Sequence, residues 1–396
     1  MPIAIISPLW ETKRGLDMSV FNVYPLFNVT PVRAKDVFVY DENDVEYLDL
    51  YGGHAVISIG HSHPKYVSAI CNQVETLGFY SNAIQNPLQL QVADKLEYLS
   101  GCKDYQLFLC SSGAEANENA LKLASFHNGK QNILAFKNSF HGRTSAAVAA
   151  TDNPKITAPL NAQQHVDFVA LGDLESVEAV LKQNQTCAII VECIQGVGGL
   201  DQSTSEFYQG LETLCNTYNT CLIADEVQSG FGRTGDFFAF QKHGFTPDII
   251  SIAKGMGNGF PVGGILIHPS IKSSFGLLGT TFGGNHLACQ AVLSVLKVLE
   301  EENLMANALE VSEYFIEKSQ DLKHLKTLKG RGLMLGLEFD FSVSEIRKNL
   351  LYKHNIFTGS SKNPNLIRIL PPLTVQKKHI DKLFQALKNE LFNLKN

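Results

Sequence analysis

Lys254 closes an apolar run and is followed by three glycines within five residues. The surrounding stretch, residues 248–264, reads DIISIAKGMGNGFPVGG. A lysine at the C-terminal end of a buried strand lies where α/β proteins bind ligands, and burial lowers the pKa of its amine and makes it a nucleophile. The glycines let a flat molecule approach the backbone. A surface lysine beside a loop would show the same pattern, so Lys254 alone identifies no chemistry.

Two acids end the preceding strand-like run. The sequence LIADEVQ places Asp225 and Glu226 there, and the next strand-like run ends at Lys254. Two strand ends can present a carboxylate and an amine to one cleft. Pyridoxal phosphate needs this pair, because it bonds to a lysine and requires a carboxylate to keep its pyridine nitrogen protonated. Taken alone, a helix cap or a turn would explain Asp225 equally well.

Two further stretches would complete such a site. Residues 110–122, CSSGAEANENALK, read as a strand end, a Ser-Gly turn and a helix start, and the free N–H groups of a helix N-terminus bind phosphate. Residues 138–144, NSFHGRT, offer Phe140 to stack on a ring and Arg143 to clamp a carboxylate. Each has a plain alternative, since many helix caps contain Ser-Gly, and Phe140 and Arg143 also fit a core and a surface position.

Short apolar runs alternate with helical patterns through the middle of the chain. This order predicts an α/β fold with a mostly parallel sheet and helices on both faces. We expect strands at 105–110, 132–136, 167–171, 187–192, 220–226, 248–253 and 263–267, and helices at 114–127, 174–183 and 205–218.

The two ends of the chain have a different pattern. Residues 36–50 alternate like an antiparallel hairpin with DEND as its turn, and a long helical pattern begins after about residue 286. We expect both termini to build one smaller domain beside the central α/β domain. The predicted boundaries give residues 18–65 and 286–396 to the smaller domain and residues 66–285 to the larger one.

Composition is that of a globular protein. The 396 residues are 44% hydrophobic and 18% charged, with a formal net charge of -6, which makes nucleic acid and anionic membrane surfaces poor partners. No apolar run reaches the length of a membrane span. The eight cysteines include no C-x-x-C pair and several lie in apolar runs, which favours reduced thiols in a cytoplasmic protein. Residues 1–17 lack a basic start, so we expect an upstream extension before Met18 rather than a signal peptide.

Together these stretches resemble the class III pyridoxal-phosphate aminotransferases of fold type I. The resemblance runs over nearly all of the chain from about residue 18. Within this family, the sequence most resembles the acetylornithine and succinylornithine aminotransferases of arginine metabolism. It implies a larger domain with a mostly parallel, seven-stranded sheet between helices, a smaller α+β domain from both termini, and a homodimer with shared active sites. The motifs that carry it, in order, are SGAEANENALKLA, FHGRT, ECIQGVGG, ADEVQSGFGRTG, IAKGMGNGFPVGG, TTFGGN and RILPPL.

The resemblance implies a role for each matching residue. Lys254 would bond to the cofactor and shuttle a proton, and Asp225 would pair with the pyridine nitrogen. Arg143 would bind the substrate carboxylate that lies far from the reacting amine. Arg368 would bind the α-carboxylate of glutamate or 2-oxoglutarate. The remaining implied contacts are Ser112, Gly113, Ala114, Phe140, Glu226, Val227 and Gln228 to the cofactor, Thr281 to the phosphate in the neighbouring subunit, and Thr280 and Glu192 to the substrate, with no metal.

Three places depart from the family pattern. Val197 stands where the family usually has a glutamate that pairs with the residue matching Arg368. An unpaired, partly buried guanidinium costs several kcal/mol, so we expect another acid, an anion or a different substrate group to meet Arg368. His54 replaces a usual isoleucine near the substrate entrance, which indicates a changed acyl pocket. His286 replaces a usual proline, and we expect it to start a helix.

The sequence therefore predicts a cytoplasmic aminotransferase that moves the δ-amino group of an Nα-acylornithine to 2-oxoglutarate. Three alternatives stay open: a donor such as ornithine or 4-aminobutyrate, a decarboxylase or aminomutase of the same fold, and a cofactor-binding protein without turnover. Arg143 and Arg368 favour a dicarboxylate partner and hence transamination, and Lys254 and Asp225 argue against a protein without turnover. The sequence does not distinguish an acetyl from a succinyl group.

Overall fold

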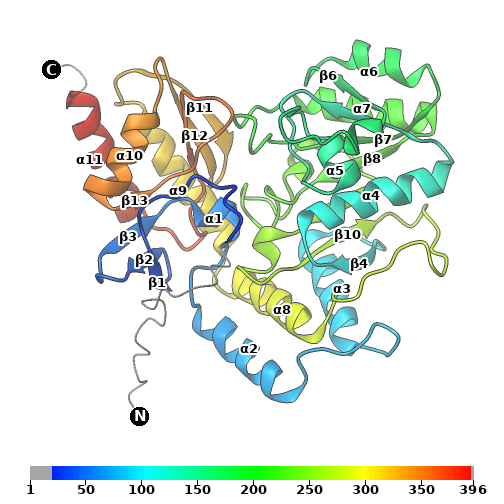
Figure 1. Ribbon diagram of the computed structural model, residues 1–396, viewed down its shortest axis with the longest axis horizontal. Coiled ribbons are helices and arrows are strands. Elements are labelled where there is room, and N and C mark those ends of the chain that lie inside the picture. The colour runs from blue at the N-terminus through cyan, green and yellow to red at the C-terminus, as the bar shows by residue number, and fades with distance from the viewer. Residues whose placement is uncertain (1–19, 394–396) are drawn as a thin grey trace, which may run out of the picture.

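A seven-stranded sheet forms the centre of the larger domain in the computed structural model, which describes residues 20–393 (Figure 1). Its strands, in spatial order, are β4 (Gln106–Cys110), β10 (Gly263–Ile267), β9 (Ile249–Ile252), β8 (Cys221–Asp225), β7 (Thr186–Val191), β5 (Asn132–Phe136) and β6 (Val166–Val169). β10 is antiparallel to both of its neighbours, and the strands from β9 to β6 are parallel. The predicted mostly parallel sheet is confirmed. The extension predicted for residues 1–17 lies outside the described residues.

Helices cover both faces of this sheet, because alternate side chains of its strands reach two different cores. On β7, Ala188 and Ile190 pack in the core that includes α4, whereas Ile189 and Val191 pack in the core that includes Phe207 of α7. The helices of this domain between β4 and β8 are α4 (Gly113–Asn128), α5 (Ser145–Ala149), α6 (Leu174–Leu181) and α7 (Ser205–Tyr218), with a short 3-10 turn η1 (Asn161–Gln163). The three helices expected in this region are therefore present.

Strands from both ends of the chain share a four-stranded sheet in the smaller domain. In Figure 1 the blue N-terminal strands lie beside the orange and red C-terminal elements. β2 and β3 form the predicted antiparallel hairpin, and β13 pairs in parallel with β3. The elements are β1 (Pro31–Lys35), β2 (Phe38–Asp41), β3 (Glu46–Asp49) and β13 (Ile356–Phe357), a second sheet of β11 (Leu325–Arg331), β12 (Met334–Phe339) and β14 (Leu366–Ile369), and helices α9 (Leu304–Ser319), α10 (Ser344–His354) and α11 (Lys377–Asn393).

Helix α8 (His286–Glu301) links the two domains. It starts at His286, as predicted, because the side chain of Asn285 accepts a hydrogen bond from the backbone N–H of Ala288 at 2.9 Å and caps the helix. α8 packs against α2 (Pro64–Thr76) and α3 (Pro87–Ser100). The boundaries near residues 65 and 285 stay a prediction, and they separate α8 from the helices on which it packs.

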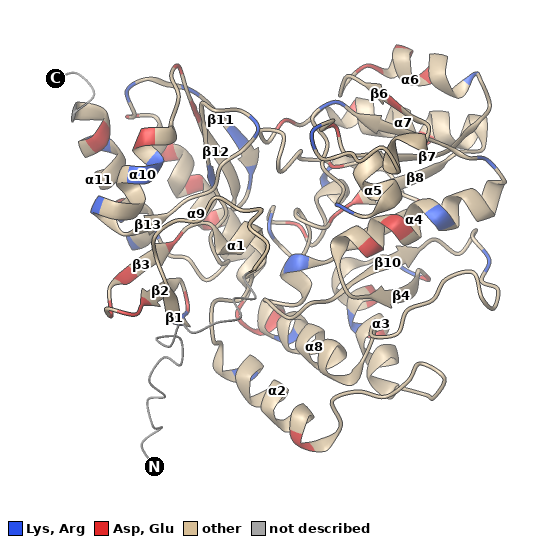
Figure 2. Ribbon diagram, in the orientation of Figure 1, with Lys and Arg blue, Asp and Glu red and all other residues tan. Residues whose placement is uncertain are grey.

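The described surface carries both signs of charge on both domains. Figure 2 shows acidic and basic residues interspersed along the helices and loops. All eight cysteines are unpaired and all but Cys71 are buried, as their apolar settings predicted. No helix within residues 20–393 is long and apolar enough to cross a membrane.

One buried carboxylate holds the loop that follows β8. Glu226 accepts hydrogen bonds from the backbone N–H of Ala239 at 2.9 Å, from that of Phe240 at 2.8 Å and from the hydroxyl of Ser229 at 2.7 Å. Burial raises the pKa of Glu226 to about 7. The two amides begin a 3-10 turn, η2 (Ala239–His243), and they are buried away from water. Glu226 therefore fixes the chain next to Asp225, the last residue of β8.

We expect Glu226→Ala to lower the free energy of unfolding by about 2–4 kcal/mol, because it leaves two buried amides without an acceptor. Ser229→Ala is the matched control, since it removes only one donor and should cost about 1 kcal/mol. Urea unfolding followed by circular dichroism measures both. Equal stabilities for the two variants would contradict the structural role of Glu226.

Candidate active site

Asp225 and Lys254 lie at neighbouring strand ends on one edge of the large sheet. β8 ends at Asp225 and pairs in parallel with β9, and Lys254 follows the last residue of β9 by two positions. Both residues line the same cavity of about 220 Å³. The cavity is therefore at the carboxyl ends of parallel strands, where open α/β sheets bind their ligands. The structure brings together the carboxylate and the amine, as the sequence predicted.

Asp225 is held in place by three hydrogen bonds. Its Oδ2 lies 2.7 Å from Nδ1 of His141 and accepts from the side-chain amide of Asn117 at 2.8 Å. Its Oδ1 accepts from the backbone N–H of Val227 at 3.0 Å. His141, Asn117 and Asp225 are all buried, so water does not compete for these bonds. Asn117 and His141 are not among the predicted site residues, although both lie inside the motifs SGAEANENALKLA and FHGRT.

Lys254 has an unusual backbone conformation, and the pKa of its amine is lowered. It starts the short 3-10 turn η3 (Lys254–Met256) with φ of +48°, in the left-handed region that non-glycine residues rarely adopt. Burial lowers the pKa of its amine, Arg368 adds to this, and Asp225 and Glu192 oppose it. A larger fraction of the amine is therefore neutral at physiological pH, which is the form that attacks a carbonyl carbon.

The N-terminus of α4 faces the same cavity. Gly113 and Ala114 line it, whereas the hydroxyl of Ser112 accepts from a backbone N–H of α4 at 3.2 Å and caps the helix. A Cβ atom on Gly113 would lie 2.5 Å from Cγ1 of Val227, and one on Gly142 would lie 2.7 Å from Cβ of Ala114. Both positions therefore require glycine. The free N–H groups at this helix end, with the helix dipole, suit a phosphate.

Glu192 supports the wall of the cavity. Its two carboxylate oxygens accept from the backbone N–H groups of Phe140 and Gly196, each at 2.9 Å. Burial raises the pKa of Glu192 to about 7. Phe140 and Val227 both line the cavity, so the structure provides two apolar side chains beside Lys254.

The two predicted substrate arginines have different surroundings. Arg368 is 3% exposed, and its guanidinium donates to the backbone oxygens of Ser360 at 2.5 Å and Gly196 at 2.7 Å. A longer contact of 3.5 Å reaches Oε1 of Gln228. Burial lowers the pKa of Arg368. Arg143 is exposed and makes no hydrogen bond or ion pair with any residue from 20 to 393.

Of the three groups expected opposite Arg368, an acid, an anion or a substrate group, the acid is absent from the described residues. No carboxylate among them lies within ion-pair distance, and backbone carbonyl oxygens take its place. Carbonyl dipoles satisfy the donors of a buried guanidinium without cancelling its charge. Arg368 thus remains a cation that can meet a substrate carboxylate.

A wider cavity of about 600 Å³ continues from Lys254 toward the smaller domain. Arg143, Val197 and Arg368 line it, and so does His54. His54 lies in a turn, α1 (Gly52–Ala55), with φ of +70°, and its Nε2 is 2.9 Å from the hydroxyl of Tyr51. Burial lowers the pKa of His54. The structure places His54 on the wall of the wider cavity, and the changed acyl pocket stays a prediction.

Four predicted contacts line neither cavity within one described chain, namely Ser112, Glu226, Thr280 and Thr281, and of these Ser112 caps α4. The carboxylate of Glu226 faces the loop amides, because adjacent residues at a strand end point to opposite sides, and its role as a cofactor contact stays a prediction. Thr280 lines a separate cavity together with Asn82 and Gln89, and Thr281 is exposed. The roles implied for Thr280 and Thr281 depend on a second subunit and stay predictions.

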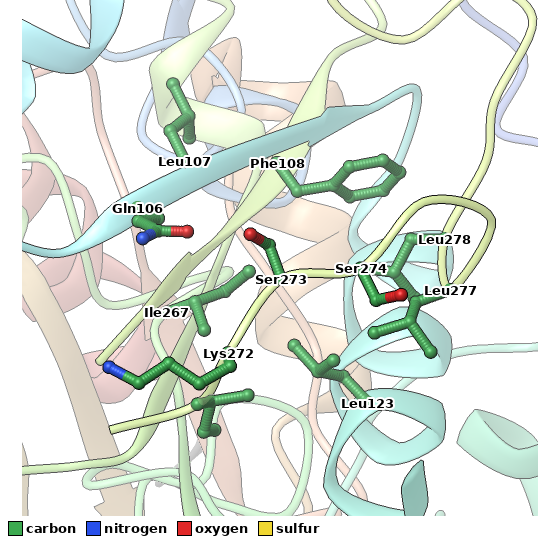
Figure 3. Close-up of a pocket in the computed structure, with 11 residues that line it drawn as sticks. Gln106, Leu107, Phe108, Leu123, Ile267, Lys272, Ser273, Ser274, Leu277 and Leu278 are labelled. Carbon is green, nitrogen blue, oxygen red and sulfur yellow. The ribbon is translucent and has the colours of Figure 1, made fainter. Parts of the chain in front are cut away.

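Another cavity, of about 210 Å³, lies beside the loop that follows β10 (Figure 3). Its walls are mostly aliphatic and aromatic, and Lys272 is its one titratable side chain among the described lining residues. It contains none of the residues that surround Lys254, and we assign it no part in catalysis. The labelled residues in Figure 3 are Gln106, Leu107, Phe108, Leu123, Ile267, Lys272, Ser273, Ser274, Leu277 and Leu278.

Comparison with known proteins gives near-full-length matches. The acetylornithine aminotransferase of Aquifex aeolicus is 40% identical and covers 94% of this chain and 99% of its own length. The succinylornithine transaminase of Photorhabdus laumondii is 37% identical and covers 89% of this chain and 90% of its own length. The crystal structure of ornithine aminotransferase from Toxoplasma gondii ME49 matches with a TM-score of 0.87 and 25% identity, over 95% of this chain and 93% of that one.

The family match spans both domains and the cavity between them. The sequence model described as Aminotransferase class-III covers residues 21–391, which include Lys254, Asp225 and both cavity arginines. The structural match extends the same conclusion to the fold, and the expected fold type I architecture is confirmed. The chain belongs to the class III aminotransferases.

Proposed function

We propose that this aminotransferase moves the δ-amino group of an Nα-acylornithine to 2-oxoglutarate, in arginine metabolism. The products are the acylated glutamate semialdehyde and glutamate. One observation carries the proposal: the amine of Lys254 and the guanidinium groups of Arg143 and Arg368 line one continuous cavity. The near-full-length relatives named for acetylornithine and succinylornithine supply the donor class. A cytoplasmic location stays a prediction.

We further propose that the inner end of the cavity holds pyridoxal phosphate. The fit rests on features of this chain: a helix N-terminus kept open by Gly113, a carboxylate at Asp225 fixed by buried donors, and the apolar walls of Phe140 and Val227. When bound, the cofactor supplies a protonated ring that withdraws electrons from the carbon carrying the transferred amine. Gly113 and Ala114 would hold its phosphate through backbone N–H groups.

In the proposed reaction, Lys254 transfers the proton and Asp225 supplies a fixed carboxylate. The neutral amine of Lys254 accepts the proton that leaves the δ-carbon of the donor, and it returns that proton later in the cycle. The carboxylate of Asp225 has one fixed orientation at the inner end, because His141 and Asn117 hold it by hydrogen bonds. The apolar side chains around Lys254 exclude water from this exchange.

The arginines select and orient the substrates. Arg143, with no partner among the described residues, is available to clamp the carboxylate of the acylornithine. Arg368 is available for the α-carboxylate of glutamate or 2-oxoglutarate, because only carbonyl and amide oxygens contact it in the described chain. A dicarboxylate acceptor can thus bind without displacing an acidic side chain.

We also propose a homodimer in which Thr281 completes the phosphate site of the neighbouring subunit. Support comes from exposed aromatic side chains next to it: Phe282 is 63% exposed and packs 5.5 Å from the ring of Phe79, which is itself 43% exposed. Large apolar side chains gathered on a surface mark interaction sites.

The first test follows the half-reaction in the absorbance spectrum of the holoenzyme. We expect Nα-acetylornithine or Nα-succinylornithine, without keto acid, to remove the visible band of the bound cofactor, and 2-oxoglutarate to restore it. Lys254→Ala is the control and should not cycle. If both acyl donors leave the band unchanged while glutamate bleaches it, the chain is an aminotransferase with another donor, such as ornithine or 4-aminobutyrate.

A second test concerns position 197. We expect Val197→Glu to place a carboxylate beside Arg368, because the carbonyl oxygen of Gly196 already accepts from that guanidinium at 2.7 Å. Competition with the substrate carboxylate should raise the KM for 2-oxoglutarate about tenfold, with a smaller effect on the amine donor. Val197→Gln is the uncharged control. Unchanged kinetics for both substrates would remove Val197 from the account of specificity.

The third test is complementation between two inactive variants. If Thr281 serves the neighbouring subunit, a mixed dimer of Lys254→Ala and Thr281→Val subunits contains one site with both wild-type residues. We therefore expect mixing and re-annealing to restore activity that neither variant has alone. A mixture that forms dimers and stays inactive would contradict the shared site.

A further inference from the structure

Lys362 is a further basic residue on the wall of the wider cavity, besides Lys254 and the two arginines. It lines this cavity together with Arg143 and Arg368, and its side chain is 50% exposed. The proposed reaction uses 2-oxoglutarate, with two carboxylates, and an acylornithine with one carboxylate on its ornithine part. Arg143 and Arg368 are sufficient for these groups. Lys362 is therefore a positive charge for which the proposed reaction has not yet supplied a partner.

The main chain around Lys362 is fixed by the site itself. The backbone N–H of Lys362 donates to the carbonyl oxygen of Val197 at 2.9 Å. Two residues earlier, the carbonyl oxygen of Ser360 accepts from Nε of Arg368 at 2.5 Å. The loop that contains Ser360 and Lys362 therefore contacts both Val197 and Arg368, the two residues most closely tied to substrate choice. It belongs to the smaller domain and places the ammonium group of Lys362 on the cavity wall.

The present partner of Lys362 leaves it free to bind a ligand. Its Nζ lies 3.4 Å from Oδ2 of Asp152 and 3.2 Å from the backbone oxygen of the same residue. Oδ2 of Asp152 already accepts from the backbone N–H of Asn138 at the shorter distance of 2.6 Å. A long, half-exposed ion pair contributes little to stability, and an ammonium group has three donors. A substrate carboxylate can therefore bind Nζ of Lys362 in place of Asp152, which lines the same cavity and keeps its shorter hydrogen bond to Asn138.

We propose that Nζ of Lys362 binds a carboxylate at the far end of the donor's acyl group. The preferred donor is then an Nα-acylornithine whose acyl group comes from a dicarboxylic acid, as succinyl does, and not one with a neutral acyl group such as acetyl. A neutral acyl group has no charge to replace the water that the ammonium group of Lys362 would lose on contact with it. The inference rests on the proposed acylornithine reaction, and the similar identities of the two kinds of relative, 40% and 37%, do not decide between the two donors.

The experiment compares kcat/KM for Nα-succinylornithine and Nα-acetylornithine in the holoenzyme. We expect Lys362→Gln to lower the value for the succinyl donor roughly tenfold and to leave the acetyl donor within about twofold, because only the first loses a charged hydrogen bond. Lys362→Glu should lower the succinyl value further. Lys348→Gln is the matched control, since Lys348 lies on α10 with its side chain 59% exposed and does not line the cavity.

Salt provides a second readout that a structural role would not change. Raising the ionic strength should narrow the preference for the succinyl donor in the wild type and leave the ratio in Lys362→Gln unaltered. Equal losses for both donors would mean that Lys362 only pins the two domains through Asp152, and the inference would be wrong. No loss for either donor would overturn it as well. If neither acyl compound reacts with the wild type while another ω-amine does, the proposed function fails first and this inference with it.

Discussion

The parallel pairing of β8 with β9 is the constraint on which the rest of the site depends. Because the two strands run in the same direction, with Asp225 paired to Ser251, they end together and deliver a carboxylate and an amine to one edge of the sheet. β10 pairs antiparallel with both β9 and β4, so β4 runs in the same direction as β9 and ends at the same edge of the sheet. The chain after β4 leads directly into α4. The helix N-terminus therefore faces the same cavity. A shift of one residue in this register would turn Asp225 away from Lys254.

Exclusion of water acts on four charged groups in and beside the cavity, with opposite consequences for acids and bases. It lowers the pKa of Lys254 and Arg368, and it raises the pKa of Glu192 and Glu226 to about 7. The chain compensates with backbone groups: amides serve the two glutamates, and carbonyl oxygens serve Arg368. These backbone groups satisfy the donors and acceptors of the three side chains, but they do not neutralise the side-chain charges. The cavity thus keeps cations for carboxylate substrates without a competing acid beside Arg368.

Strand ends, helix starts and the Lys254–Asp225 pair follow from the sequence, because each depends on local periodicity or on the order of elements. The seven strands and the hairpin of residues 36–50 appear where expected. Contacts between distant segments do not follow in this way. The amide of Asn117 reaches Asp225 across 108 residues, and no local pattern signals that bond. The side on which Glu226 points, and the carbonyl oxygens that surround Arg368, depend on packing that a single sequence does not encode locally.

The most direct test of the account is to find the amine that bonds to the cofactor. The holoenzyme would be reduced with borohydride, digested and analysed by peptide mass spectrometry. The position of Lys254 at the end of β9, with its lowered pKa and with Asp225 beside it, leads us to expect the reduced cofactor on Lys254 alone. Modification of a different lysine, or none after reduction of a fully loaded enzyme, would contradict the account.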